Sequence, residues 1–238
     1  MKNRAFGFLQ KFPLRVLLFL LYSSEICGQK EDYNWILGSD PIENDSLFAF
    51  MRVDFNFSPP SIERIEKLPY LWLTNTCVSD ADGHLRYFSN GSTIYDANCE
   101  IIENGSGFQP DSYVLGLGTQ SVILLDSIFI SGEMVSLYIP PDSLTSWYSP
   151  VQYSIISQHA SGGYFVSKKS NILLNDTIAI SGNTACRSAD GKHWWLLLNR
   201  LNSNVFFRVL FKSGNPFIIE NRKNLGIQPK SMKNCFSE

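Results

Sequence analysis

Two segments of this chain share a turn pattern. Val78–Phe88 reads VSDADGHLRYF, and Arg187–Leu197 reads RSADGKHWWLL. Each begins directly after a cysteine and places Ala-Asp-Gly between runs of residues that favour β-structure. Gly tolerates positive φ and Asp bonds its own backbone, so Asp-Gly between such runs predicts a β-hairpin turn. A turn repeated in similar surroundings indicates a chain built from repeated β-units.

Alternation of apolar and polar residues predicts the clearest strand, Leu47–Phe57. Every second residue from Leu47 onward is apolar, while Arg52, Asp54 and Asn56 lie between them. This pattern indicates a sheet with one apolar face and one wetter face. We expect the following prolines to end the strand and Ile62–Lys67 to form a short helical turn.

Short strands with turn signals between them predict an all-β fold. We expect a meander from Leu71 to Tyr95, turned at Asp80–Gly83 and Asn90-Gly91, and a second one from Thr184 to Phe211. The expected strands are Leu71–Val78, Leu85–Ser89, Thr93–Tyr95, Val122–Ile130, Met134–Tyr138, Val151–Ile156, Tyr164–Val166, Ile172–Leu174, Thr184–Arg187, Trp194–Leu198 and Val205–Phe211.

The repeat favours a propeller over a sandwich, because every propeller blade is the same four-stranded unit. From Ala81 to Ala189 is 189 − 81 = 108 residues. Blades take about 40 to 50 residues, so the second turn lies two blades on, or one blade on with an insertion. We therefore predict a partial β-propeller of short antiparallel meander blades. A closed propeller needs about four to eight blades, so we expect residues 29–238 to form an incomplete one.

The first residues predict a signal peptide over residues 1–28. Lys2, Arg4 and further basic residues precede the apolar run Val16–Tyr22, and small residues follow before Gln29. A membrane anchor needs about 20 apolar residues, and this run is shorter. Glu25 argues against acylation of Cys27. We expect a secreted or cell-surface protein with no membrane span in the mature chain, in which Cys77, Cys99, Cys186 and Cys235 allow three disulfide pairings.

Composition gives no sign of a charged partner. The net charge is −2 and charged residues make up 18% of the chain, so we expect no binding to nucleic acid. We expect Cys77 and Cys186 to be small buried residues in strands.

No motif in the chain indicates catalysis, a metal or a cofactor. Asp80 and Asp82 resemble the start of a calcium loop, but residue 91 is Gly where the loop needs a bidentate Glu, so turn chemistry accounts for them. His84 and His193 follow the two turns, and His159 is the third histidine; none has a recognised catalytic spacing. We expect no catalytic or metal-binding residues, and ligand-binding residues stay unassigned.

Two further patterns are a pair of tryptophans and a set of glycosylation sequons. Trp194-Trp195 could stack a sugar, but adjacent strand residues point to opposite faces, so packing is the stronger expectation. Sequons for N-glycosylation occur at Asn44, Asn56, Asn90, Asn104 and Asn175.

Most of Asp32–Phe211 resembles the N-terminal part of large secreted proteins of Bacteroidetes, of the Lewinella and Saprospiria type. The segments that carry it are VSDADGHLRYFSNGSTIYDANCEIIENGSG (Val78–Gly107) and TACRSADGKHWWLLLNRLNSNVFFRVLF (Thr184–Phe211). That family is similar to WD40- or YVTN-type propellers and often ends in a type IX secretion sorting domain. The resemblance implies further blades beyond Glu238, and therefore a truncated chain here. It also implies a bacterial protein, in which the N-glycosylation sequons would be coincidental.

These observations predict an exported, non-catalytic propeller scaffold or binding module for a protein or glycan ligand. The alternatives are a secreted propeller hydrolase or lyase that acts on polysaccharide, and a truncated, non-functional fragment. The enzyme would need acid and base residues that converge, such as Asp80, Asp82, His84 and His193.

Overall fold

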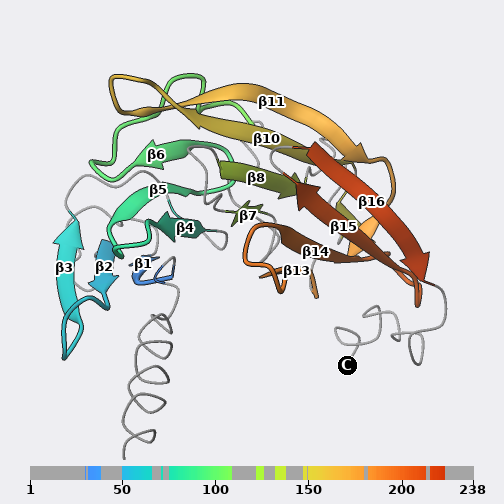
Figure 1. Cartoon of the computed structure of the whole chain (residues 1–238), viewed down its shortest axis with the longest axis horizontal. Helices are drawn as coiled ribbons and strands as arrows, with labels where there is room; N and C mark the ends of the chain where they lie inside the picture. The colour runs from blue at the N-terminus through green and yellow to red at the C-terminus, as the bar shows by residue number, and fades with distance from the viewer. Residues whose placement is uncertain are drawn as a thin grey trace, which may run out of the picture. The chain divides into compact units, whose positions relative to one another are not determined.

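In the computed structural model the chain divides into two compact units, Met1–Lys30 and Glu31–Glu238. The structure describes residues 30, 32–38, 50–65, 71, 75–108, 122–125, 132–137, 147–148, 150–179, 182–212 and 215–222. The regular elements among these residues are all strands, and they pair antiparallel (Figure 1). The all-β prediction is confirmed, while the predicted leader 1–28 lies outside the described residues.

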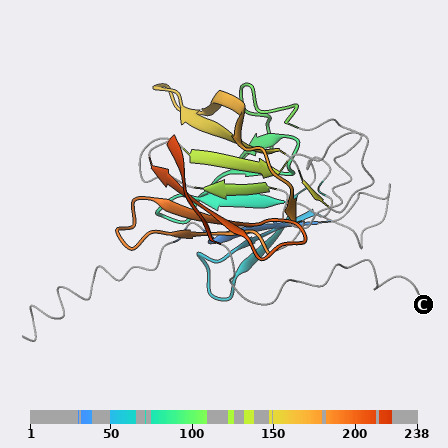
Figure 2. The same cartoon turned by 90° about the vertical axis from the view of Figure 1, so that its right-hand side faces the viewer.

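Within the described ranges, sixteen strands form five sheets, which Figure 2 shows from the side. Two sheets have three strands each: β1 (Asn34–Leu37), β2 (Phe50–Asp54) and β3 (Ser61–Ile65), then β4 (Thr76–Ser79), β5 (Leu85–Ser89) and β6 (Ile94–Asp96). A four-stranded sheet has the order β11 (Tyr164–Leu174), β10 (Val151–Gln158), β8 (Gly132–Leu137) and β7 (Val122–Leu125). The other consists of β13 (Thr184–Arg187), β14 (Trp194–Asn199), β15 (Phe206–Lys212) and β16 (Asn215–Arg222), and β9 (Trp147–Tyr148) pairs with β12 (Ile178–Ala179). In the part of the chain that the structure describes, these sheets do not close into a ring.

Both predicted meanders are present, and β5 and β13 have the predicted bounds. The predicted helical turn at Ile62–Lys67 is wrong, because Ser61–Ile65 is strand β3. It pairs with β2 in a register that sets Ile62 opposite Val53. Pairing with β2 satisfies the backbone hydrogen bonds of this segment, and its two β-branched isoleucines favour a strand. Together these effects outweigh the weak local preference for a helix.

Each of three core clusters joins sheets that follow one another in the chain. Between the β1–β3 and β4–β6 sheets lie Ile36, Phe50, Leu71, Leu85, Phe88 and Tyr95. Between β4–β6 and the β7, β8, β10, β11 sheet lie Val78, Tyr87, Ile94, Ile102, Phe108, Val122, Leu124, Ile156 and Val166. The third cluster reaches from Leu125 and Val151 to β14 and β15 and includes Ile178, Leu196, Leu198, Val205, Phe207, Val209 and Phe211.

The predicted Ala-Asp-Gly turns are confirmed as hairpin turns. Asp80 N donates to His84 O over 2.8 Å, and Gly83 N donates back to Asp80 O over 3.0 Å. The turn from Ser188 to His193 repeats this pattern with one residue more. In both turns the glycine has positive φ, 89° and 68°.

Two turns that the sequence comparison missed repeat the shorter form. These turns are DANCE (Asp96–Glu100) and HASGG (His159–Gly163). In each, the N–H of the first residue donates to the carbonyl of the fifth, and the N–H of the fourth residue donates to the carbonyl of the first. The fourth residue again has positive φ, which is 65° at Cys99 and 89° at Gly162. Neither turn contains Asp-Gly: DANCE has cysteine at the position that favours glycine, and HASGG has serine before its glycine.

A buried polar network links the β1–β3 sheet to the β4–β5 turn. Asn34 is fully buried, and its Nδ2 donates to Ser79 Oγ over 2.8 Å and to Gly83 O over 2.7 Å. Its Oδ1 accepts from Arg52 Nε over 2.7 Å. Asn56 Nδ2 also donates to Gly83 O, over 2.7 Å. The polar side of β2 therefore faces another sheet.

Candidate binding surface

The β4–β5 turn brings Asp80, Asp82 and His84 together, with ligand atoms within 4.8 Å of one another. Asp80 Oδ1 accepts from the backbone N–H groups of Asp82 (2.9 Å) and His84 (2.8 Å), and Oδ2 lies 3.4 Å from His84 Nδ1. Burial raises the pKa of Asp80, but these hydrogen bonds and His84 outweigh it, so the net pKa is lowered. The turn alone explains the cluster.

The second turn holds a serine, an aspartate and a histidine. Ser188 Oγ donates to Asp190 Oδ1, and His193 Nδ1 lies 2.8 Å from Asp190 Oδ2. The Ser188 hydroxyl, with the Lys192 N–H and His193, lowers the pKa of Asp190. The carboxylate lies between hydroxyl and imidazole, so the imidazole does not contact Ser188 Oγ as a general base would. We expected no recognised catalytic arrangement here, yet His84 and His193 each have a carboxylate neighbour.

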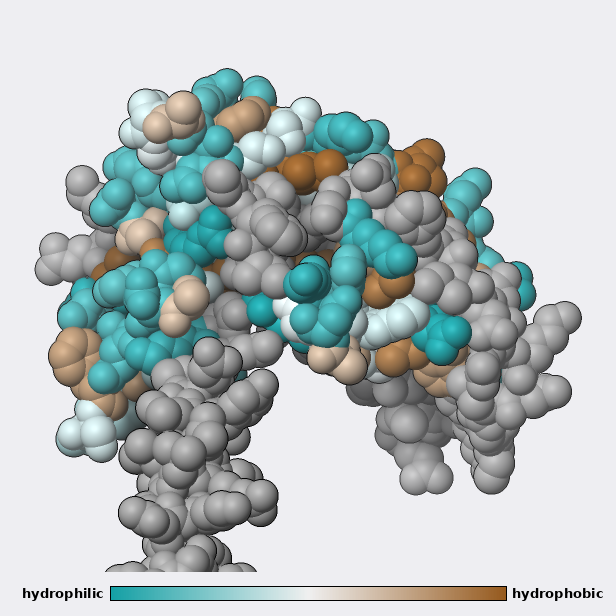
Figure 3. Space-filling view, viewed as in Figure 1, coloured by the Kyte–Doolittle hydropathy of each residue, from teal (hydrophilic) through white to brown (hydrophobic). Residues whose placement is uncertain are grey.

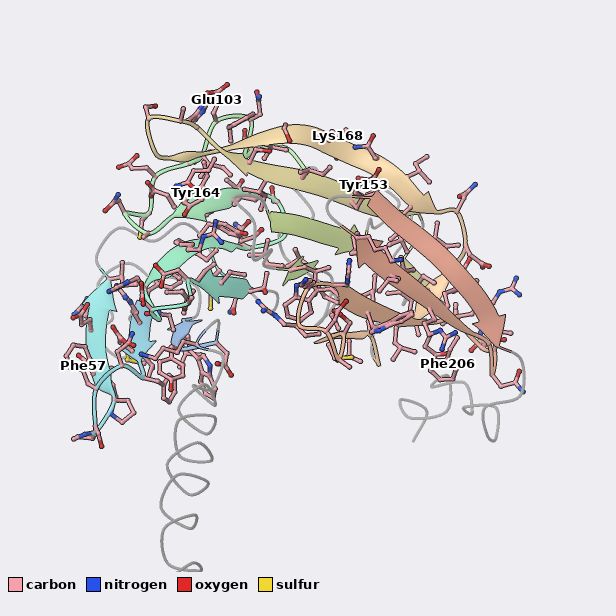
Figure 4. The ribbon with its side chains drawn as sticks, in the orientation of Figure 1. Phe57, Glu103, Tyr153, Tyr164, Lys168 and Phe206 are labelled. Carbon is pink, nitrogen blue, oxygen red and sulfur yellow. The ribbon has the colours of Figure 1, made fainter. Side chains whose placement is uncertain are left out.

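His159 belongs to a contact between the β10–β11 hairpin and the loop after β6. Its Nε2 lies 3.2 Å from Glu103 Oε2, and its ring stacks on Phe165 with centroids 4.3 Å apart. Val166 N donates to Glu103 O over 2.9 Å. Figure 4 shows Glu103 beside this hairpin. The three histidines lie on three separate turns and do not form one site.

The paired tryptophans pack as expected. Trp194 packs against the core cluster of β14 and β15, with Arg187 Cζ 5.1 Å from its ring centroid. Trp195 is half-buried, and Arg208 Cζ lies 5.1 Å from its centroid. An arginine covers one face of each ring, so neither ring offers that face to a sugar.

The cysteines correct one expectation. Cys186 is exposed, not buried, whereas Cys77 is half-buried with its Sγ 2.8 Å from Asn34 O. Burial raises the pKa of the Cys77 thiol to about 11. Burial and the carboxylates of Asp96 and Glu100 raise the pKa of Cys99. These three are free thiols, and Cys235 lies outside the described residues.

The described sequons differ in access. Asn90 is buried, and its Oδ1 accepts from Ser92 N and Thr93 N. The Asn56 amide donates to Asp54 and Gly83. Asn104 and Asn175 are exposed in loops, and Asn44 lies outside the described residues.

The largest departure from the sequence pattern is the orientation of β2. The predicted wetter face carries Arg52 and Asp54, which point toward Asn34 and the β4–β6 sheet, and Phe50 is buried on the same side. The apolar face that includes Met51 and Val53 points away from the core. The alternation of β2 was predicted correctly. However, its polar face points inward and its apolar face points to solvent, which is the reverse of the expectation.

This outer face extends across all three strands of the sheet. The register sets Trp35 opposite Val53 and Ile62, and Leu37 opposite Met51. Side chains of paired residues lie on the same face. We define the outer face as Trp35, Leu37, Met51, Val53, Phe55, Ile62 and Arg64.

Large hydrophobic side chains are exposed here more than elsewhere in the described part of the chain. Trp35 is 51% exposed and Ile62 66%, and five of the seven exposed large hydrophobic residues belong to this face or, as Phe57 does, follow β2. Figure 3 shows hydrophobic surface at the edge near β3, and Figure 4 shows Phe57 beside this strand. A contiguous patch of this kind usually marks an interaction site.

A second candidate, an open hollow at the β14–β15 turn, is polar. It has a volume of about 400 Å³, and Asp176 and Arg200 are among its lining residues. Arg200 Nε lies 3.1 Å from Asp176 Oδ1, so the hollow's charged groups pair with each other. Small-molecule sites are mostly apolar, and this hollow lacks that lining.

No protein-family model matches the chain, and neither curated proteins nor solved structures give a match. The similarity to the Bacteroidetes proteins therefore stays a prediction. Within the described residues, no helix has the length and apolar character to cross a membrane.

Proposed function

We propose that this chain is an exported, non-catalytic binding module on a propeller-like scaffold, and that it binds another polypeptide through the outer face of the β1–β3 sheet. The observation that carries the proposal is an apolar stripe patterned for burial but left exposed at Trp35 and Ile62. Conflicts between local pattern and tertiary position are expected at functional sites. The core clusters between successive sheets support the propeller-like scaffold.

The chemistry of the outer face favours a polypeptide over a glycan. Aliphatic Leu37 and Ile62 adjoin the aromatic pair Trp35 and Phe55, whose centroids are 4.9 Å apart, and Arg64 is the single charged residue on the face. A sugar site combines an aromatic platform with several hydrogen-bonding side chains, whereas depletion of charge at the centre is typical of protein interfaces.

Export rests on the pattern of residues 1–28 alone. If the full coding sequence is expressed with its own leader in a secreting host, we expect the exported product to begin at Gln29. Terminal sequencing of that product checks the cleavage site, and an uncleaved chain retained in the cells would contradict it.

The alternative, a secreted hydrolase or lyase for polysaccharide, depends on the carboxylate–histidine pairs of the two turns. An enzyme of this kind would release reducing or unsaturated ends from a polysaccharide and lose that activity in Asp80→Asn or Asp190→Asn. If the chain is a binding module, incubation with polysaccharide releases no reducing or unsaturated ends.

Photo-cross-linking tests the binding proposal. Benzoylphenylalanine would replace Ile62 on the outer face or, as a control, Ile172 on β11, which is equally exposed (66% and 65%). The full chain is produced in cells that export it and is then irradiated. We expect a discrete polypeptide adduct from position 62 and none from position 172. The absence of an adduct at 62, or equal adducts at both, would overturn the proposal.

A further inference from the structure

We infer that the polypeptide bound by the outer face is a second copy of this chain, with the two β1–β3 sheets packed face to face. This inference rests on the proposed function and names its partner. The inner face of the sheet is already occupied: Ile36 and Phe50 are buried against the β4–β6 sheet, and Arg52 bonds Asn34. Only the outer face is left to be covered.

The composition of the face is that of an interface between identical subunits. Such interfaces are more apolar than those of transient complexes, and charge is depleted at their centre. Within the outer face, Val53 lies at the middle of the middle strand, between Trp35 and Ile62. Arg64 lies on the edge strand β3, away from that centre.

The area fits a second copy of the same face. Four large side chains of the outer face, together with Phe57 directly after β2, are exposed by 39% to 66%. At about 200 Å² for a large side chain, they present roughly 500 Å². Two copies would cover about 1,000 Å² in total, which is near the lower limit for a specific interface. The outer face of a second copy has the same size, so the outer faces of the two copies can cover each other.

Charge and geometry are compatible with two-fold symmetry. A two-fold axis that lies in the interface along the middle strand, near Val53, pairs each residue of one copy with a different residue of the other, and only residues on the axis meet their own counterpart. It sets the two Arg64 side chains at opposite ends, so like charges do not meet. Two apolar sheet faces pack about 10 Å apart with their strands at about −30°. The small area predicts a reversible, concentration-dependent dimer.

Light scattering and sedimentation of the exported chain from about 1 µM to about 100 µM test this inference. We expect the mass to rise from one chain to two. Ile62→Lys places a charge within the face and should weaken association at least about tenfold. Ile172→Lys is the matched control and should associate as the parent chain does.

A monomer throughout the range, an equal loss in both variants, or growth to large aggregates would overturn the dimer. The cross-linking experiment separates the two proposals. An adduct at position 62 that contains a different polypeptide overturns the dimer and keeps the binding function. An adduct between two copies supports both.

Discussion

Arg52 Nε donates to the side-chain oxygen of Asn34 over 2.7 Å, and Asn34 is fully buried between two sheets. The asparagine amide also bonds Ser79 Oγ and Gly83 O. This contact explains why the polar side of β2 points inward: it satisfies a buried amide that water cannot reach. The apolar side of β2 is thereby turned outward.

Asn34→Ala should therefore destabilise the fold by about 3 kcal/mol, because it leaves several buried polar partners without a hydrogen bond. Urea unfolding measures the loss. Asn98→Ala is the control, since Asn98 is exposed in the DANCE turn and should change stability by about 0.5 kcal/mol or less. Equal losses in the two variants would contradict the network's role.

Gly83 and Gly162 occupy the same position of two hairpin turns and have the same φ of 89°. A Cβ on Gly83 would overlap Asn56 Oδ1, whereas a Cβ on Gly162 meets no atom within 4 Å. Gly162→Ala should cost about 1 kcal/mol from φ alone. Gly83→Ala should cost about 2 kcal/mol or more, because Asn56 must also move. Thermal unfolding compares the pair, and a smaller loss at Gly83 would refute the crowding.

Asp80 should contribute to the pH dependence of stability. Its pKa is lowered in the fold, so the carboxylate stabilises the protein above its unfolded pKa of about 3.9, and this contribution disappears as the pH falls through that value toward the folded pKa. Melting temperatures of the parent and Asp80→Asn should differ at about pH 7 and approach each other as the pH falls below the unfolded pKa of about 3.9. Parallel curves would show that the carboxylate's charge does not stabilise the turn.

Thiol labelling should separate the described cysteines. Cys186 is exposed, whereas the half-buried Cys77 has a pKa raised to about 11, which leaves little reactive thiolate near neutral pH. Iodoacetamide added to the folded protein should modify Cys186 first and Cys77 only on unfolding. Mass spectrometry of the labelled peptides reads the order. Faster modification of Cys77 would contradict its burial.

Local sequence was sufficient for the two Asp-Gly turns and for most strands. Asp-Gly predicted the turns after β4 and β13, alternation predicted β2, and β5 and β14 were predicted as the strands that follow the two turns. It failed at Ser61–Ile65, where pairing with β2 decided the conformation, and at Cys99, where cysteine takes the positive φ that Gly83 takes in the matching turn. Sequence also identified Asp80, Asp82 and His84 as turn residues, and the structure gives them that role.

The candidate site could not be predicted from the sequence. Alternation in β2 shows that Met51 and Arg52 lie on opposite faces, but period two is the same whichever face is buried. Only the tertiary structure decided this, because Asn34 comes from another strand and bonds Arg52, while Phe50 fills the core beside it. The chain alone determined an all-β protein with repeated hairpin turns; the packing of one sheet on the next determined that its apolar stripe faces outward.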